Sequence, residues 1–290
     1  MSRIAWRVPG QPKVALLWIF ILGFSVIVQL GYNVVHQIQD VPLKPNLFRL
    51  IMAVIVDSFS NHLLWELLLN GFVLFSLLVL GKQLIQQVRS YKRWKCYVDS
   101  NSNPVMTEYF SEKYKKENLR IEVVSDSACI AMTAGFFRPK ILLSTGSVEM
   151  FNEQELESVI FHEMYHYKYR HPLQILILSI IAECLAFLPV IKGLVHHYKV
   201  WMELLADRYA IFRMGSEIQL AHVLLKMLKI DPAKPQAYAV HFANESVNYR
   251  LKQLIDPQTI INVPFFERKT LLPSIVVLVI MTTTFIYGCV

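Results

Sequence analysis

Two histidines and a glutamate stand in the order His-Glu-x-x-His, at His162, Glu163 and His166. The four-residue spacing places both imidazoles on one face of a helix, one turn apart, where they can bind a single metal ion. Glu163 lies beside them, in position to accept a proton from a water molecule bound to that metal. The motif predicts zinc-dependent hydrolysis; the alternative is a chance match on a surface helix with two solvated histidines.

The flanking residues predict that the motif lies on a helix over residues 153–171. Asn152 followed by Glu155 is typical of an N-cap with a capping box. Pro172 opposes a straight continuation, so the helix should end near residue 171. Apolar residues recur at helical spacing, at Leu156, Val159, Ile160 and Tyr167.

A catalytic zinc site also needs a third protein ligand and an open position for water. Glu203 is the best candidate, and Asp207 follows four residues later on the same face of a predicted helix. One of these carboxylates can bind the metal while the other accepts the free N–H of a ligand histidine. The competing third ligands are His171, His196 and His197.

Three segments before the motif helix have the composition of strands, at residues 121–125, 129–134 and 140–144. A small sheet beside a metal-binding helix offers an edge strand along which an extended peptide can lie. This favours a polypeptide substrate. The alternative is a sheet that only covers the helices.

The composition indicates a membrane protein. Of the 290 residues, 54% are apolar and only 18% are charged. Soluble domains are about one quarter charged. The net charge of +7 comes from basic residues beside apolar segments. The positive-inside rule explains this placement without a nucleic-acid partner. The four cysteines are widely separated and form no Cys-x-x-Cys pair, so neither a disulfide framework nor a thiolate zinc site is expected.

Three apolar runs lie at residues 14–35, 61–80 and 270–290. Each is long enough to cross a hydrocarbon core of about 30 Å. The second run carries one charge, Glu66, near an end. The loop between the first two runs has balanced charges, as expected outside the cell. Basic residues place the N-terminus and the stretch after the second run in the cytoplasm: Arg3, Arg7, Lys13, Lys82, Arg89, Lys92, Arg93 and Lys95.

A fourth apolar run, 172–191, cannot be a straight span if Glu203 binds the same metal as His166, because the two residues would then lie about 30 Å apart. The 36 intervening residues are too few for two full spans. Two limbs of about 13 residues, however, reach about 20 Å each. We therefore expect a re-entrant or interfacial helical hairpin at 172–198, with Glu183 near its tip or against protein.

Several segments together resemble the BlaR/MecR-type membrane metallopeptidases. They are residues 134–143, 162–166, 170–172, 203–207 and 250–252, and the resemblance covers about residues 120–255. It implies a membrane zinc endopeptidase of the gluzincin type that holds one zinc ion. His162, His166 and Glu203 would be the ligands, Glu163 the catalytic base, and Asp207 the residue that supports a ligand histidine.

The sequence departs from this family at two points. His171 stands where the family usually has an aspartate. A histidine at this point is more similar to the CAAX prenyl protease and HtpX type, and that sister family stays an alternative. The antibiotic sensors of the family carry a large penicillin-binding domain after the last span, and the sequence has none before its last residue, so β-lactam sensing is not expected.

The predicted fold is a mainly α membrane protein with three to four transmembrane helices and a cytoplasmic gluzincin-like α+β domain containing a small antiparallel sheet. The predicted domains are 1–88 with two transmembrane helices, 89–269 with the zinc metallopeptidase, and 270–290 as a last span whose C-terminus lies outside a bacterial cell.

The predicted function is hydrolysis of peptide bonds in membrane-bound or cytoplasmic proteins, in a regulatory role or on the chain itself. The expected partners are a polypeptide substrate and the lipid bilayer, with a homodimer left open. The rival functions are a non-proteolytic transmembrane signal transducer with a structural metal site and, with less support, a transporter.

Overall fold

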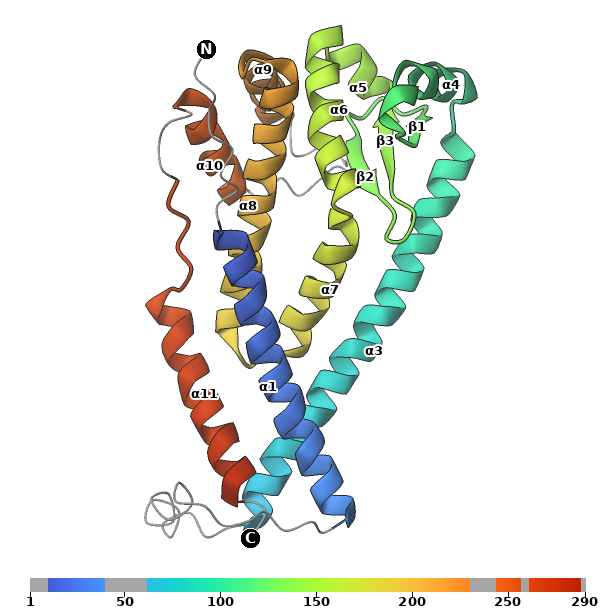
Figure 1. Ribbon diagram of the computed structural model, residues 1–290. Helices are drawn as coiled ribbons and strands as arrows, with labels where there is room; N and C mark the ends of the chain where they lie inside the picture. Colours follow the sequence, from blue (N-terminus) through green and yellow to red (C-terminus); the bar gives the residue numbers. More distant parts are fainter. Residues whose placement is uncertain (1–9, 40–61, 230–243, 257–260, 288–290) are drawn as a thin grey trace. The chain divides into compact units, whose positions relative to one another are not determined.

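The computed structural model describes residues 10–39, 62–229, 244–256 and 261–287, apart from some side chains at helix ends. Figure 1 shows the described helices and strands, which divide into two compact units. The described part of unit 1 lies within Val88–Ile177 and Lys199–Val263. Unit 2 comprises Gly10–Gln87, Leu178–Tyr198 and Pro264–Val290.

Unit 1 contains a three-stranded sheet of β1 (Ile121–Val124), β2 (Ala131–Ala134) and β3 (Lys140–Ser144). The strand order is β1-β3-β2, in which β3 pairs parallel to β1 and antiparallel to β2. The three strands lie where the sequence predicts them. The expectation of an antiparallel sheet is wrong, because the sheet is mixed.

The connection between β1 and β2 explains this topology. The carbonyl of Asp126 accepts hydrogen bonds from the amide of Gly146 and the hydroxyl of Thr145, both just after β3. The approach is so close that a Cβ on Gly146 would collide with the carbonyl of Ser127. The chain therefore passes the end of β3 before entering β2, and the turn at Gly135 (φ +93°) returns β3 into the gap between β1 and β2.

The two faces of β3 bury side chains in different clusters, as the alternation of a strand requires. Ile141 and Leu143 pack with α6 (Glu153–Lys168) and α9 (Ile218–Leu228). Leu142 packs on the other face with Val98 of α3 (His62–Asn101). The sheet is thus held between helices on both faces. The remaining short elements of unit 1 are α4 (Pro104–Lys113), η2 (Lys115–Glu117) and α5 (Thr145–Met150).

Helix α6 carries the His-Glu-x-x-His motif and begins as predicted. Asn152 Oδ1 accepts from the amide of Glu155, while Glu155 Oε2 accepts from the amide of Asn152, so the capping box is confirmed. The helix ends at residue 168, three residues earlier than expected. Arg170 adopts a left-handed conformation (φ +52°). Pro172 lies in the first turn of the next helix, where its missing N–H costs nothing.

Two helices follow, α7 (His171–Cys184) and α8 (Pro189–Met214), joined by residues 185–188. Their adjoining ends belong to unit 2, where Lys192 Nζ lies 3.4 Å from Glu183 Oε1. Glu183 thus lies near the tip and pairs with a residue of the other helix. The later part of α8 belongs to unit 1, as does α10 (Asn244–Ile255).

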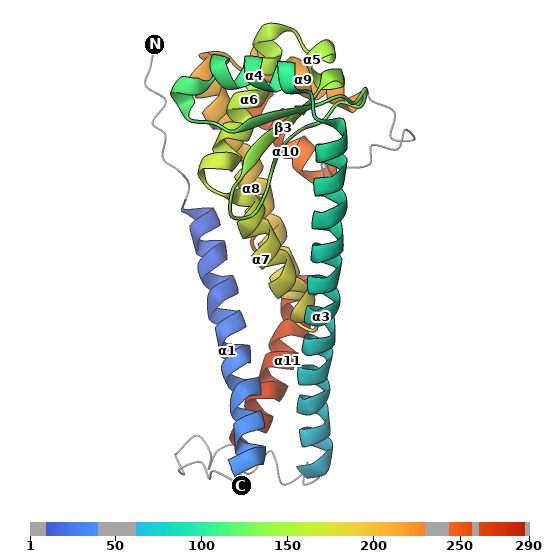
Figure 2. The same ribbon diagram turned by 90° about the vertical axis from the view of Figure 1, so that its right-hand side faces the viewer.

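Unit 2 also contains α1 (Gln11–Gln39) and α11 (Arg268–Tyr287), which contact each other (Figure 2). The Gln29 side-chain amide donates to Thr282 Oγ1 at 3.2 Å. The backbone amide of Val190 donates to Ser274 Oγ at 3.0 Å, which joins α8 to α11. Unit 2 is therefore held together by buried apolar side chains, among them Ile19, Val26 and Ile191, and by these polar contacts.

Two helices among the described residues are long and apolar enough to cross a membrane, over Gln11–Tyr32 and Leu69–Asn101. The third predicted span begins within α11, but its last residues, 288–290, lie outside the described residues. The side chain of Glu66 and residues 40–61 lie outside them as well. Large apolar side chains are exposed along all three helices: Leu17, Phe20, Phe24, Leu74, Leu77, Leu78, Leu272, Val276 and Val279.

Candidate metal centre

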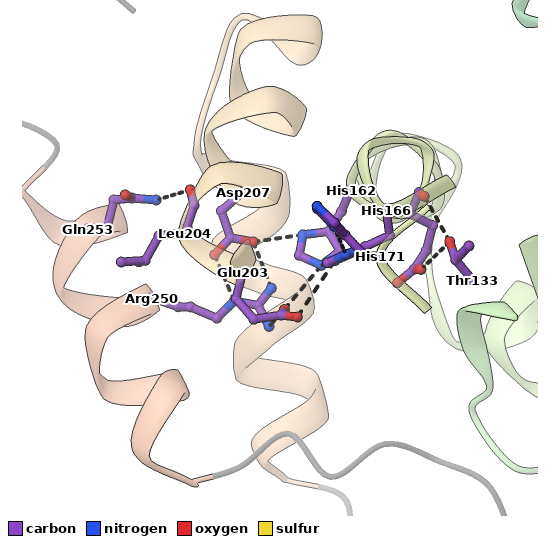
Figure 3. A network of polar contacts seen from close by, with 10 residues as sticks. Thr133, His162, His166, His171, Glu203, Leu204, Asp207, Arg250 and Gln253 are labelled. Atoms are coloured by element: carbon purple, nitrogen blue, oxygen red, sulfur yellow. Dashed lines mark hydrogen bonds and ion pairs between the residues drawn. The ribbon is translucent and has the colours of Figure 1, made fainter. Parts of the chain in front are cut away.

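One buried face of α6 presents both histidines of the motif (Figure 3). The Nε2 atoms of His162 and His166 lie 3.1 Å apart. The helical spacing allows this approach, because residues four apart lie one above the other on the same face. Both rings therefore direct a nitrogen to the same point.

Glu203 approaches that point from α8. Its Oε2 lies 3.4 Å from His162 Nε2, and its Oε1 lies 3.6 Å from His166 Nε2. One ligand atom from each of the three residues lies within 4.8 Å of the others. Zinc–ligand bonds of about 2.0–2.1 Å in a tetrahedral site place the ligand atoms about 3.3 Å from one another. The donor set and its spacing therefore fit zinc.

Asp207 contacts the other nitrogen of the first histidine. Its Oδ1 lies 2.9 Å from His162 Nδ1, and both residues are buried. A carboxylate there holds the proton on Nδ1 and leaves the lone pair on Nε2 for a metal. The structure thus brings together all five residues that the sequence singles out for the site.

Glu163 is held by β2. The hydroxyl of Thr133 lies 2.8 Å from Glu163 Oε2 and 2.8 Å from the Glu163 backbone carbonyl. Burial raises the pKa of the Glu163 carboxyl. A raised pKa suits a carboxylate that accepts a proton and passes it on. The sequence predicts a strand at Thr133 but gives no signal that this hydroxyl meets the motif glutamate.

The ionisable groups of the metal-free site have strongly shifted pKa values. Burial opposes the charge on His162, but contacts with Asp207 and Glu203 outweigh it and raise its pKa to about 9. Burial lowers the pKa of His166 to about 4. Burial also opposes the charge on Glu203, yet the adjacent histidines and Arg250 hold its pKa well below the ordinary value.

His171, a competing ligand in the sequence, has a different place. Its Nδ1 lies 2.8 Å from Nδ1 of His166, on the side of that ring away from Glu203. Burial lowers the pKa of His171 to about 3, which favours a neutral ring at this contact. His171 therefore supports a candidate ligand.

The other two competing histidines belong to unit 2. His197 is buried, and its Nδ1 lies 3.3 Å from the carbonyl of Pro264. Neither His196 nor His197 belongs to the described group of candidate ligands.

Arg250 of α10 is a second residue that sequence reasoning missed, after Thr133. It is buried, and its Nε and Nη2 each lie 2.7 Å from an oxygen of Asp207. The sequence places Arg250 in a family-like segment, but nothing in its spacing from the motif indicates this contact.

A His-Glu-x-x-His helix beside a small sheet, with a carboxylate from a second helix, defines the class of metallopeptidases with this motif. The chain belongs to the BlaR1 peptidase M56 family, whose family model matches residues 52–254. This confirms the resemblance seen in the sequence and implies peptidase activity. A search of curated proteins finds no match.

Proposed function

We propose that the chain is a membrane-embedded zinc endopeptidase in which His162, His166 and Glu203 bind one zinc ion. The convergence of their three ligand atoms within 4.8 Å is the observation that carries the proposal. These atoms come from two helices, and Glu203 is far from both histidines in sequence, so local helical geometry alone does not produce the site. Membership of a peptidase family supports the same reaction class.

Bound at these atoms, zinc would polarise a peptide carbonyl and lower the pKa of a water molecule towards neutrality. Glu163 accepts a proton from the attacking water and delivers it to the leaving nitrogen as the C–N bond breaks. The water oxygen forms its bond to the carbonyl carbon as it loses this proton, before the C–N bond breaks. Thr133 orients the Glu163 carboxylate through its hydroxyl.

The substrate in this proposal is an extended polypeptide. Within the described sheet β2 pairs with β3 alone, which leaves its other edge available for backbone hydrogen bonds. Thr133 of β2 contacts Glu163, so a peptide along residues 131–134 would pass close to the proposed base. The geometry favours a peptide over a small molecule.

Exposed apolar side chains along α1 and α3 support a place in the lipid bilayer, because soluble surfaces rarely carry such large continuous patches. In this proposal, basic residues hold the N-terminus and unit 1 in the cytoplasm, and the hairpin of α7 and α8 is re-entrant or interfacial. Substrates are then membrane-bound proteins or cytoplasmic proteins near the bilayer, and the chain itself is one candidate.

The decisive variant is Glu163→Gln, which keeps the size of the side chain and removes the base. The purified full chain in detergent should bind zinc at the wild-type stoichiometry, measured by elemental analysis. Its cleavage of fluorescently labelled casein should fall by at least about 100-fold, since general-base catalysis contributes that much or more. The matched control is Glu149→Gln, an exposed acid of the same unit. Wild-type cleavage by the Glu163 variant would refute the proposal.

A further inference from the structure

We propose that Arg250 is a positioning residue for the metal centre, and that α10 thereby sets the zinc affinity of ligands carried by α6 and α8. This inference rests on the proposed function. It concerns a residue that lies 47 positions beyond Glu203 in sequence and carries no ligand atom itself. Figure 3 shows its guanidinium beside both Asp207 and Glu203.

The guanidinium donates two hydrogen bonds to the Asp207 carboxylate. Nε donates to Oδ2 and Nη2 donates to Oδ1, each at 2.7 Å. Two parallel bonds fix the plane of a carboxylate, whereas a single bond leaves it free to rotate. The same Oδ1 lies 2.9 Å from His162 Nδ1, so fixing this plane also fixes the orientation of the His162 ring.

Arg250 also reaches a candidate ligand directly. Its Nη1 lies 3.4 Å from Glu203 Oε2, the oxygen that faces His162. The one side chain therefore acts on two of the three ligands, on His162 through Asp207 and on Glu203 by direct attraction. His166 has a separate support in His171.

Burial makes these contacts costly to lose. The Arg250 side chain is 2% exposed and the Asp207 side chain is fully buried. A buried carboxylate deprived of its partner leaves an uncompensated charge, which the surrounding groups relieve by moving. Such movement would pull Asp207 away from His162.

A lysine cannot replace this arrangement, because its ammonium group is a point charge without the planar fork of a guanidinium. Arg250→Lys therefore keeps the positive charge and removes the pair of parallel hydrogen bonds to Asp207. The chain offers a matched control in Arg208 of α8, whose Nε donates to Gln253 Oε1 of α10 at 2.8 Å. Arg208 links the same two helices through a residue that has no contact with the candidate ligands among those described.

The experiment measures zinc affinity by competition with a chromophoric chelator on the full chain in detergent, together with thermal unfolding. Arg250→Lys should weaken zinc binding by about 10- to 100-fold, the usual effect of removing support from a metal ligand. Arg208→Lys should change it by less than about twofold. Unchanged affinity in the Arg250 variant, or an equal loss in both variants, would overturn the proposal.

Asp207→Asn changes the acceptor of the same two hydrogen bonds, and this single variant does not depend on folding of the Arg250 variant. It should weaken zinc binding to a similar extent, and the double variant Asp207→Asn/Arg250→Lys should be no weaker than the weaker single variant. Additive losses, or wild-type affinity in Asp207→Asn, would contradict the inference. If the wild-type chain binds zinc and cleaves casein while Arg250→Lys has unchanged zinc affinity, the inference about Arg250 fails and the proposed function stands. If the wild-type chain binds no zinc, the proposed function itself fails.

Discussion

The two ends of α6 both bury acidic side chains, but they satisfy them in different ways. At the first turn, Glu155 accepts from the amide of Asn152 and pairs with Lys226 of α9 at 2.6 Å. In the later turns, His162 and His166 meet a glutamate that stands on α8. The first end combines a partner in its own turn with Lys226 of α9, and the other depends on residues distant in sequence.

This difference separates stability from chemistry along one helix. The first end can change without disturbing the candidate metal centre, because neither Asn152 nor Lys226 is among the contacts of the proposed ligands. The ligand end gains its charge pattern only when α6, α8 and α10 are all in place. We therefore expect substitutions at the two ends to affect different measurements.

The largest effect should come from Glu203→Gln, which removes the only proposed ligand that is not on α6. Zinc affinity should fall by more than about 100-fold, beyond the range typical of supporting residues. Cleavage should fall with it. Elemental analysis and a casein assay check this, with Glu149→Gln as the control. Stoichiometric zinc in the Glu203 variant would exclude this residue as a ligand.

Removal of the metal should be the next largest effect and should act on the ligand end alone. A ligand present at about 100 times its dissociation constant stabilises the folded state by about 2.7 kcal/mol. Chelation should therefore lower the unfolding midpoint and abolish cleavage, and added zinc should restore both. Full cleavage after exhaustive chelation would contradict a metal-dependent mechanism.

Asn152→Ala should have a smaller effect, confined to stability. Loss of an N-cap side chain costs about 1 kcal/mol, so the unfolding midpoint should fall while zinc affinity stays unchanged. Asn262→Ala, at an exposed asparagine of the same unit, is the control. A parallel loss of zinc affinity would show that the two ends of α6 are coupled.

The smallest effect should be a pH dependence at the first turn. Burial opposes the charge on Glu155, but Lys226, the Asn152 amide and His222 outweigh it and lower its pKa. A lowered pKa in the folded state adds stability above the unfolded pKa of about 4.3, and this stability is lost as the pH falls through the folded value.

Thermal unfolding of wild type and Glu155→Gln should thus differ by a constant amount near neutral pH and converge in acid. Glu157→Gln, on the same helix, controls for the general loss of a negative charge. A difference that persists to the lowest pH at which the protein folds would disprove this role of Glu155.

Much of α6 could be predicted from the sequence, because its signals are local. The capping box needs residues three apart, and the two histidines need residues four apart, so helical geometry fixes both. The helix end was less predictable. It is determined by the left-handed conformation of Arg170, whereas the more obvious proline lies within the next helix.

The rest of the site was only partly predictable. Glu203 and Asp207 stood out because two acids occur four apart on an apolar helix, but the contacts of Thr133 and Arg250 depend on how distant elements pack. The roles of the histidines were similarly ambiguous, and only the geometry distinguishes His171 beside His166 from His197 in unit 2. The sheet topology was missed because strand composition carries no information about pairing order.

The insertion of β3 between β1 and β2 also favours one order of assembly. β2 and β3 are joined by five residues. They can pair early, since closing so short a loop costs little entropy. β1 leaves the ribosome first, but its partner β3 lies much further along the chain, so this parallel pairing closes a longer loop. We therefore expect β2, the strand beside the motif helix, to pair with β3 before β1 does. The slower, non-local pairing is then the one at the far edge of the sheet.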